Sequence, residues 1–155
     1  MCIRDRYNSK EMAELLISHG ASIDEKNING ETALHFVAMI NSIEIAELLI
    51  SHGANINEKD EDGKTALHFA ASENSNEAAE ILISHGANIN EKDKDGETAL
   101  HYAAQNNSEE TAKVLISHGA NINEENYNDD SVLRKAELFN CKETIELLIS
   151  HGAKR

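Results

Sequence analysis

Eight histidines are the residues whose type and spacing come closest to a metal or acid-base site. They form two series, each with a constant 33-residue interval between neighbouring members: His35, His68 and His101, and His19, His52, His85, His118 and His151. If copies of a 33-residue unit stack side by side, equivalent histidines lie roughly 10 Å apart. The ligands of a zinc ion lie about 2 Å from it. The spacing therefore predicts structural histidines and no bound metal.

Other chemistry is not indicated either. The sequence shows no nucleophile with a base at a fixed spacing, no phosphate-binding Gly loop and no Cys pair, because Cys2 and Cys141 are far apart. The acidic stretch 93–96 lacks the remaining oxygen ligands and the terminal Glu of a helix-loop-helix calcium site, so we expect a solvated turn there. We expect no enzyme activity and no cofactor.

Composition predicts a globular chain with an acidic surface. Of 155 residues, 40% are apolar and 4% are aromatic, so the core must be built from small and branched aliphatic side chains. The net charge of -14 disfavours nucleic acid and anionic membranes and favours a basic protein partner. Two distant cysteines, no bilayer-length apolar run and no leader predict an intracellular protein, cytoplasmic or nuclear. We expect a monomer.

The chain is internally repetitive. The string ISHGA recurs with a 33-residue period, beginning at Ile17, Ile50, Ile83, Ile116 and Ile149. Segments 55–87 and 88–120 are identical at 24 of 33 positions. Each period reads as a turn, a short helix, a reversal and a second helix, and neither helix is long enough to be stable alone. Each copy must therefore bury its apolar face against its neighbours.

Turn and capping residues define the helices within a period. Residues 60–63 are turn formers, Thr65 is placed to cap the first helix, Ser75 to cap the second, and Gly86 to end it. Asn74 stands between the helices, where the chain needs a left-handed residue. The same Asn recurs at Asn8, Asn41, Asn107 and Asn140.

These motifs resemble the ankyrin repeat family. Residues 63–71 and 96–104 read Gly-x-Thr-Ala-Leu-His-x-Ala-Ala, and residues 82–87 read Leu-Ile-x-x-Gly-Ala. The resemblance implies an all-α ankyrin-repeat solenoid of helix pairs with β-hairpin-like turn fingers, with about four full repeats plus an N-terminal half repeat. The predicted units are a partial repeat 8–21 and repeats 22–54, 55–87, 88–120 and 121–153, preceded by a non-repeat segment 1–7, foreign or a junction, and followed by a tail 154–155.

The sequence departs from the family pattern in a few places. The Asn series replaces the usual Gly between helices, and Ala replaces the usual Pro at Ala33, Ala66 and Ala99. The last copy has Asp129, Ser131 and Arg134 where Gly, Thr and His are usual, so it is degenerate or terminal.

The resemblance also implies roles for particular side chains. It implies that the first histidine series bonds turn backbone, and the second series suits the negative end of a helix. It places Asn57, Asn90 and Asn123 at a position hydroxylated in some ankyrin proteins, although Asn replaces the usual acidic residue two places earlier.

Partner binding is the function that the resemblance implies. In the family, binding residues usually lie at the finger tips and on the exposed side of the first helix; by position these are Ile28, Asn29, Glu31, Met39, Ile40, Glu61, Asp62, Lys64, Ser72, Glu73, Lys94, Asp95, Glu97, Gln105, Asn106, Tyr127, Asn128, Asp130, Leu138 and Phe139. Several of these positions differ between repeats, which fits partner choice and equally fits drift on a free surface.

The predicted function is a non-catalytic protein-protein interaction scaffold whose partner has a basic patch. The fingers 24–31, 58–64, 91–97 and 124–130 together carry -10 of the net charge of -14. Apolar residues at either end of the surface add candidate anchors. The alternatives are an ankyrin-repeat part of a larger ligase adaptor or kinase that recruits substrates, and a structural spacer.

Overall fold

The computed structural model describes the backbone of residues 3–155 and the side chains of residues 10–155. This part of the chain contains nine α-helices: α1 (Ile3–Ser18), α2 (Ala33–Met39), α3 (Ile43–Ser51), α4 (Ala66–Ser72), α5 (Asn76–Ser84), α6 (Ala99–Gln105), α7 (Glu109–Ser117), α8 (Val132–Leu138) and α9 (Lys142–Ser150). From α2 onward the helices alternate between seven and nine residues in length. The predicted order of a short first helix followed by a second helix is confirmed, and the second helix is the longer of the two.

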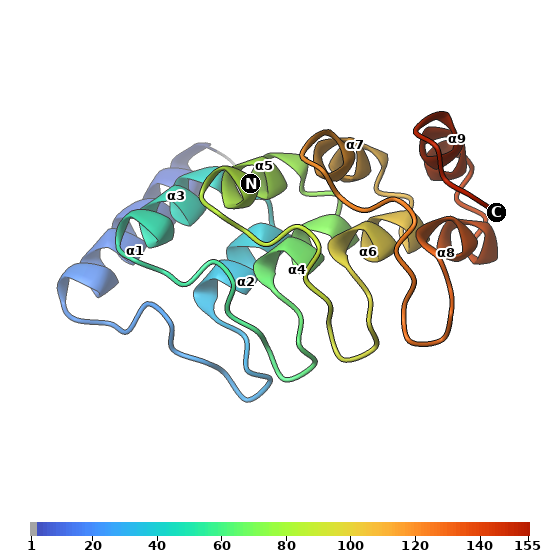
Figure 1. Cartoon of the computed structure of the whole chain (residues 1–155). Helices are drawn as coiled ribbons and strands as arrows, with labels where there is room; N and C mark the ends of the chain where they lie inside the picture. Colours follow the sequence, from blue (N-terminus) through green and yellow to red (C-terminus); the bar gives the residue numbers. More distant parts are fainter. Residues whose placement is uncertain (1–2) are drawn as a thin grey trace.

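The helices form two layers that run along the molecule (Figure 1). The first helices α2, α4, α6 and α8 make one layer, and α1, α3, α5, α7 and α9 make the other; each helix packs against its equivalent in the neighbouring repeat. The fingers project from the layer of first helices. Between residues 3 and 155 there is no strand, only an isolated antiparallel bridge between Glu125 and Ser131. The prediction of an all-α solenoid is confirmed.

Aliphatic ladders fill the space between the layers. The largest fully buried side chains include one Leu from each first helix and one Leu from most second helices: Leu34, Leu67, Leu100, Leu133, Leu82, Leu115 and Leu148. Leu49 is 5% exposed. Each such side chain contributes roughly 2 to 3 kcal/mol by leaving water. Leu16, the equivalent residue on α1, is 56% exposed, because in the described part of the chain α1 has no first helix of its own repeat to pack against. No helix in the described residues is long and apolar enough to cross a membrane.

The predicted helix starts are confirmed, with one difference in detail. Thr65 is the N-cap of α4, in extended backbone, and Thr32 and Thr98 occupy the same place before α2 and α6. Ser75 is the N-cap of α5, but its hydroxyl donates to the carbonyl oxygen of Met39 at 3.0 Å. The Ser75 side chain therefore joins two repeats and makes no capping hydrogen bond to its own helix.

The left-handed Asn positions are confirmed in four of five cases. Asn41, Asn74, Asn107 and Asn140 have φ values of 54° to 56°. The prediction for Asn8 is wrong, because Asn8 lies inside the continuous helix α1. Residues 3–7 do not carry a first-helix sequence, and within residues 3–155 no helix precedes α1 from which the backbone would reverse at Asn8.

Candidate functional site

The first histidine series joins neighbouring repeats. His68 is buried, and its Nδ1 accepts the backbone N–H of Thr65 at 3.0 Å, so the ring proton is on Nε2. Nε2 donates to the carbonyl oxygen of Glu97 in the next finger at 3.1 Å. His35 and His101 repeat both contacts. Burial lowers the pKa of His68 and of His101, which keeps the rings neutral.

The second histidine series ends the second helices. The Nδ1 of His52 donates to the carbonyl oxygen of Leu48, four residues earlier, at 2.9 Å. The same bond is made by the other members, His19, His85, His118 and His151. The described residues contain no group of three or more His, Cys, Asp or Glu side chains able to hold one metal ion. Both histidine series therefore have the structural contacts that the sequence predicted.

The Asn residues between helices do more than accept a left-handed backbone. The Oδ1 of Asn74 accepts the backbone N–H of Thr111 at 3.0 Å and the Thr111 hydroxyl at 3.2 Å. Asn41 and Asn107 make the corresponding backbone contact to the second helix of the next repeat. Each of these Asn residues therefore caps the second helix of the following repeat, which explains why Asn is used here in place of Gly.

The fingers stack edge to edge. The N–H of Lys94 donates to the carbonyl oxygen of Asp62 at 2.9 Å, and the same bond joins the other neighbouring fingers. Gly63 has a φ of 81°, and a Cβ added to it would lie 3.1 Å from the Lys94 nitrogen. Glycine is needed here because the next finger passes so close to its Cα.

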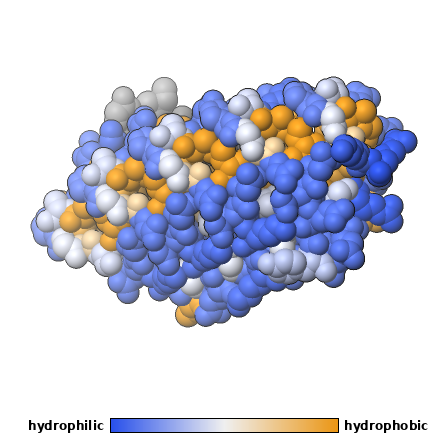
Figure 2. Space-filling model, in the orientation of Figure 1, coloured by the Kyte–Doolittle hydropathy of each residue, from blue (hydrophilic) through white to orange (hydrophobic). Residues whose placement is uncertain are grey.

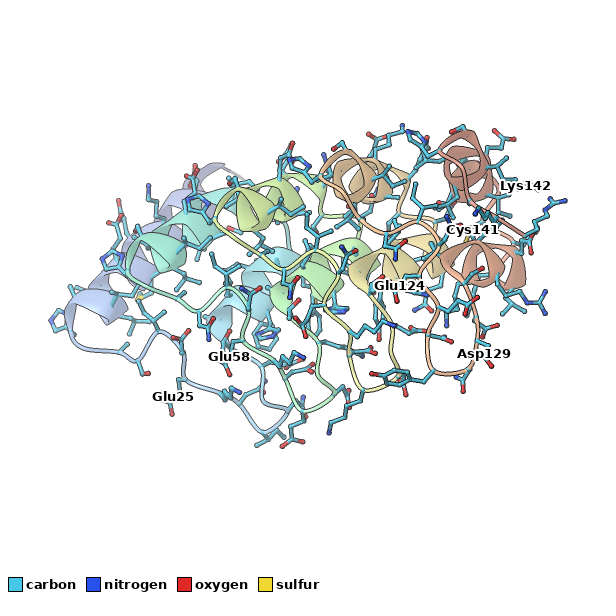
Figure 3. All side chains as sticks on the ribbon, viewed as in Figure 1. Glu25, Glu58, Glu124, Asp129, Cys141 and Lys142 are labelled. Carbon is cyan, nitrogen blue, oxygen red and sulfur yellow. The ribbon has the colours of Figure 1, made fainter. Side chains whose placement is uncertain are left out.

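A row of ion pairs reinforces this stack. Lys59 Nζ lies 2.5 Å from Glu91 Oε1, and Lys26–Glu58 and Lys92–Glu124 form equivalent pairs at 2.6 and 2.7 Å. Hydrogen bonds from these lysines hold the pKa of Glu58, Glu91 and Glu124 below its usual value. Figure 3 labels Glu58 and Glu124 in the first and last of these pairs. Sequence reasoning missed the pairs, although a Lys that is followed by a Glu one position short of a full period was a usable signal.

The predicted binding residues fall into three groups by exposure. Most are exposed: Ile28, Asn29, Ile40, Glu61, Asp62, Glu73, Lys94, Asp95, Asn106, Tyr127, Asn128, Leu138 and Phe139. Six are partly buried: Glu31, Met39, Lys64, Ser72, Gln105 and Asp130. One, Glu97, is buried.

Glu97 is therefore not available on the predicted surface. It is 7% exposed, and its Oε1 lies 2.5 Å from Lys135 Nζ and 3.1 Å from Asn126 Nδ2. Lys135 occupies the position that Tyr102 holds one repeat earlier. The carboxylate of Glu97 thus belongs to the junction between the last two repeats.

One aromatic residue on each of the first three first helices packs against the preceding repeat, except at the N-terminal end, where Phe36 is exposed. The ring of Phe69 packs edge-on against His35, and Tyr102 packs in the same way against His68. Phe36 is 45% exposed, and among the described residues no first helix before α1 supplies a histidine for it to pack against. Sequence reasoning missed Phe36 as a surface residue.

Tyr102 is held in place by its own finger. Its hydroxyl donates to Asp93 Oδ2 at 2.7 Å, and burial raises its pKa. Lys64 Nζ lies 5.4 Å from the centre of the Tyr102 ring. Asp93 is 4% exposed and accepts backbone N–H groups of its own turn, so it is a structural carboxylate.

The exposed faces differ in character. In Figure 2 an apolar band follows the long axis of the molecule at the level of the second helices, and the surface below it, where the fingers lie, is hydrophilic. Glu61, Asp62 and Asp95 on the fingers are exposed, and so is Glu73 at the C-terminal end of α4. The fingers thus present open carboxylates in addition to the lysine-paired ones.

Helix pairs of constant length, stacked by contacts that recur with the sequence period, define the molecule as a helical repeat solenoid. A family model described as ankyrin repeats (3 copies) matches residues 1–93 and 87–154. The chain belongs to the ankyrin repeat family, as the sequence motifs predicted. A search of curated proteins gives no match.

Proposed function

We propose that the protein is a non-catalytic binding module that holds a basic segment of a partner protein across its fingers and first helices. Ankyrin repeats are generally protein-protein interaction modules. The observation that carries the proposal is the set of open carboxylates on the fingers and helix ends. Among the described side chains, Glu61, Glu73 and Asp95 have no cation within 4.0 Å, and Asp62 has only Lys64 at 3.8 Å. These groups attract lysine or arginine from a partner.

Apolar side chains at both ends of this surface support the same proposal. Ile28 is 92% exposed and Ile40 is 63% exposed at the N-terminal end, next to the partly exposed Phe36. At the C-terminal end Tyr127 is 68% exposed and Phe139 is 57% exposed. A partner segment with basic residues between apolar ones complements this order, because apolar anchors supply affinity and charges supply orientation.

The test is a comparison of two charge-reversal variants with equal net charge. One carries Glu61→Lys, Asp62→Lys and Asp95→Lys on the fingers; Glu97 is left unchanged because it is buried. The control carries Glu44→Lys, Glu47→Lys and Glu146→Lys, all exposed on the second helices and outside the fingers. Pull-down with mass spectrometry identifies proteins retained by the unmodified chain, and the association rate of each is then measured against ionic strength.

The proposal expects that the finger variant loses these proteins, that the control retains them, and that association slows as salt rises. Equal loss in both variants would show a non-specific effect of net charge. Retention by the finger variant, or an association rate that ignores salt, would contradict the proposal. An intracellular location and a monomeric state stay predictions.

A further inference from the structure

We infer that repeat 121–153 closes the ladder of fingers, so that its outward flank is a solvent-facing end and does not seat another repeat. Each internal finger is joined to the next by contacts that involve a glycine, a lysine and a histidine. All three residue types are replaced in the last repeat, at positions 129, 125 and 134. The inference rests on these residues and would hold whatever follows residue 155.

In the last finger, steric overlap prevents the close contact that glycine allows in the internal fingers. Gly96 has a φ of 79°, and a Cβ on it would lie 2.8 Å from the backbone nitrogen of Tyr127 in the next finger. Asp129 stands one full period later with a φ of 60°, so the left-handed turn is kept but a Cβ is present. Figure 3 labels Asp129 on this last finger. A further finger docked in the same way would overlap that Cβ.

The contact made by a lysine in the internal fingers is lost in the last finger, where a glutamate takes its place. Lys92 pairs with Glu124 and also donates to the carbonyl oxygen of residue 125 at 3.1 Å. Glu125 occupies the equivalent position in the last finger. A carboxylate cannot donate to a following carbonyl group, and it would repel the glutamate that every internal finger presents at that place.

The histidine contact is removed as well. His101 Nε2 donates to the carbonyl oxygen of Asp130 in the next finger, at 3.3 Å. Arg134 takes its place; its side chain is 58% exposed, and its Nε lies 4.0 Å from Asp130 of its own finger. Arg134 therefore turns toward its own repeat and solvent, where a neutral buried ring would reach outward.

An open polar groove lies beside the last finger. It is lined by both cationic and anionic side chains and by polar ones: Asn123, Glu125, Asp129, Asp130, Ser131, Arg134, Lys154 and Arg155. The second-helix side of the last repeat keeps the pattern of the internal repeats, since Asn140 has a φ of 56°. Closure is thus confined to the finger, and three substitutions there suffice to test it.

The experiment appends a copy of residues 88–120 directly after Ala153, which keeps the 33-residue period. This repeat is added to the unmodified chain and to a variant with Glu125→Lys, Asp129→Gly and Arg134→His. Amide hydrogen exchange of the appended segment is measured by mass spectrometry. The same triple variant without the appended repeat is the control for folding of residues 3–153.

We expect the appended repeat to exchange almost as fast as an unfolded chain on the unmodified protein, and at least about 100-fold more slowly on the triple variant. Equal protection on both chains would overturn the inference, because the last finger would then accept a neighbour as it is. Protection on neither chain, while the control stays folded, would also overturn it, because these three residues would not be what closes the ladder.

Discussion

The contact between neighbouring fingers can be tested by adding one methyl group in two places within the same repeat. Gly96 and Gly119 both have left-handed backbone, with φ values of 79° and 93°. Alanine at either position meets the same backbone strain, about 1 to 2 kcal/mol. Their surroundings differ: apart from its own chain neighbours, no heavy atom lies within 4 Å of a Cβ on Gly119, whereas a Cβ on Gly96 contacts the next finger.

The extra cost at Gly96 follows from the fixed position of the Tyr127 amide. The added Cβ would lie 2.7 Å from Tyr127 Cδ1 and 2.8 Å from its backbone nitrogen. The ring can rotate away, but the nitrogen is held by its bond to the carbonyl oxygen of Asp95 at 3.0 Å. The finger must retreat by roughly 0.6 Å to reach an ordinary contact. Overpacking of this kind adds about 1 to 3 kcal/mol.

We therefore expect Gly119→Ala to lower the free energy of unfolding by about 1 kcal/mol and Gly96→Ala by about 3 kcal/mol. Urea denaturation followed by circular dichroism measures both values. Hydrogen exchange of residues 121–153 shows whether the loss at Gly96 concentrates in the following repeat, as nearest-neighbour stacking requires. Equal losses in the two variants would refute the argument that finger proximity, and not backbone strain alone, demands glycine.

Three further outcomes follow from the junctions. Burial lowers the pKa of His68 and His101 in the folded chain, so the unfolded chain binds more protons once the pH falls below the ordinary histidine pKa of about 6.5. The free energy of unfolding is therefore unaffected well above that pH and falls as the pH drops through it, with a limiting slope of about 1.4 kcal/mol per pH unit for each ring. Urea titration at several pH values measures this slope. Asn74→Gly improves the backbone fit but removes the cap on Thr111, so we expect a net loss of about 1 kcal/mol in unfolding free energy; a gain would show that φ alone selects this residue. Lys135→Ala leaves the buried Glu97 carboxylate without its cation, and we expect the free energy of unfolding, measured by urea or thermal denaturation, to fall by about 3 kcal/mol. Adding Glu97→Gln to this variant should restore most of that loss.

The elements of the fold could be predicted because their causes are local in the sequence. Thr65, Asn74 and Gly86 each fix a helix end through their own backbone or within a few residues, and the structure has these ends where the sequence predicts them. Asn8 shows the limit of this reasoning. The same residue type without a preceding first helix has no turn to occupy, and it lies within a helix.

The junctions were predicted less well because their partners lie in the next repeat. The period says that copies lie side by side, but not which atoms meet across the interface. The acceptor of His68 lies 29 residues further along the chain, and the donor to Asn74 lies 37 residues further. The glutamate that pairs with Lys59 lies one residue short of a full period. These offsets depend on how the fingers lean relative to the helices. The direction of a side chain, such as that of Ser75 toward the preceding repeat, follows from the same geometry.

Charged residues that recur in every internal finger and charged residues that vary between repeats have different roles: the first join repeats, and the second are mostly exposed. Charges that recur in every internal finger, such as Lys59 and Glu91, are paired across a junction, because every junction needs the same contact. Charges that change between repeats, such as Glu61 and its counterpart Lys94, are exposed, because no neighbouring repeat constrains them. Glu97 varies and yet is buried, since Lys135 in the next repeat changes with it.

Variation therefore indicates an open surface only where the following repeat does not change in a complementary way. Glu73 satisfies that condition, because it is exposed and has no ion pair within the described part of the chain. Asn106, its counterpart one repeat later, is also exposed, but its side-chain amide donates to the Ser72 hydroxyl of the preceding repeat at 3.4 Å. A partner that distinguishes this array from another one must use such positions, because the paired lysines and glutamates are already occupied. If charge reversal at Glu73 alone left the affinity of a captured partner unchanged while reversal at Glu91 weakened it without loss of stability, this division would be wrong.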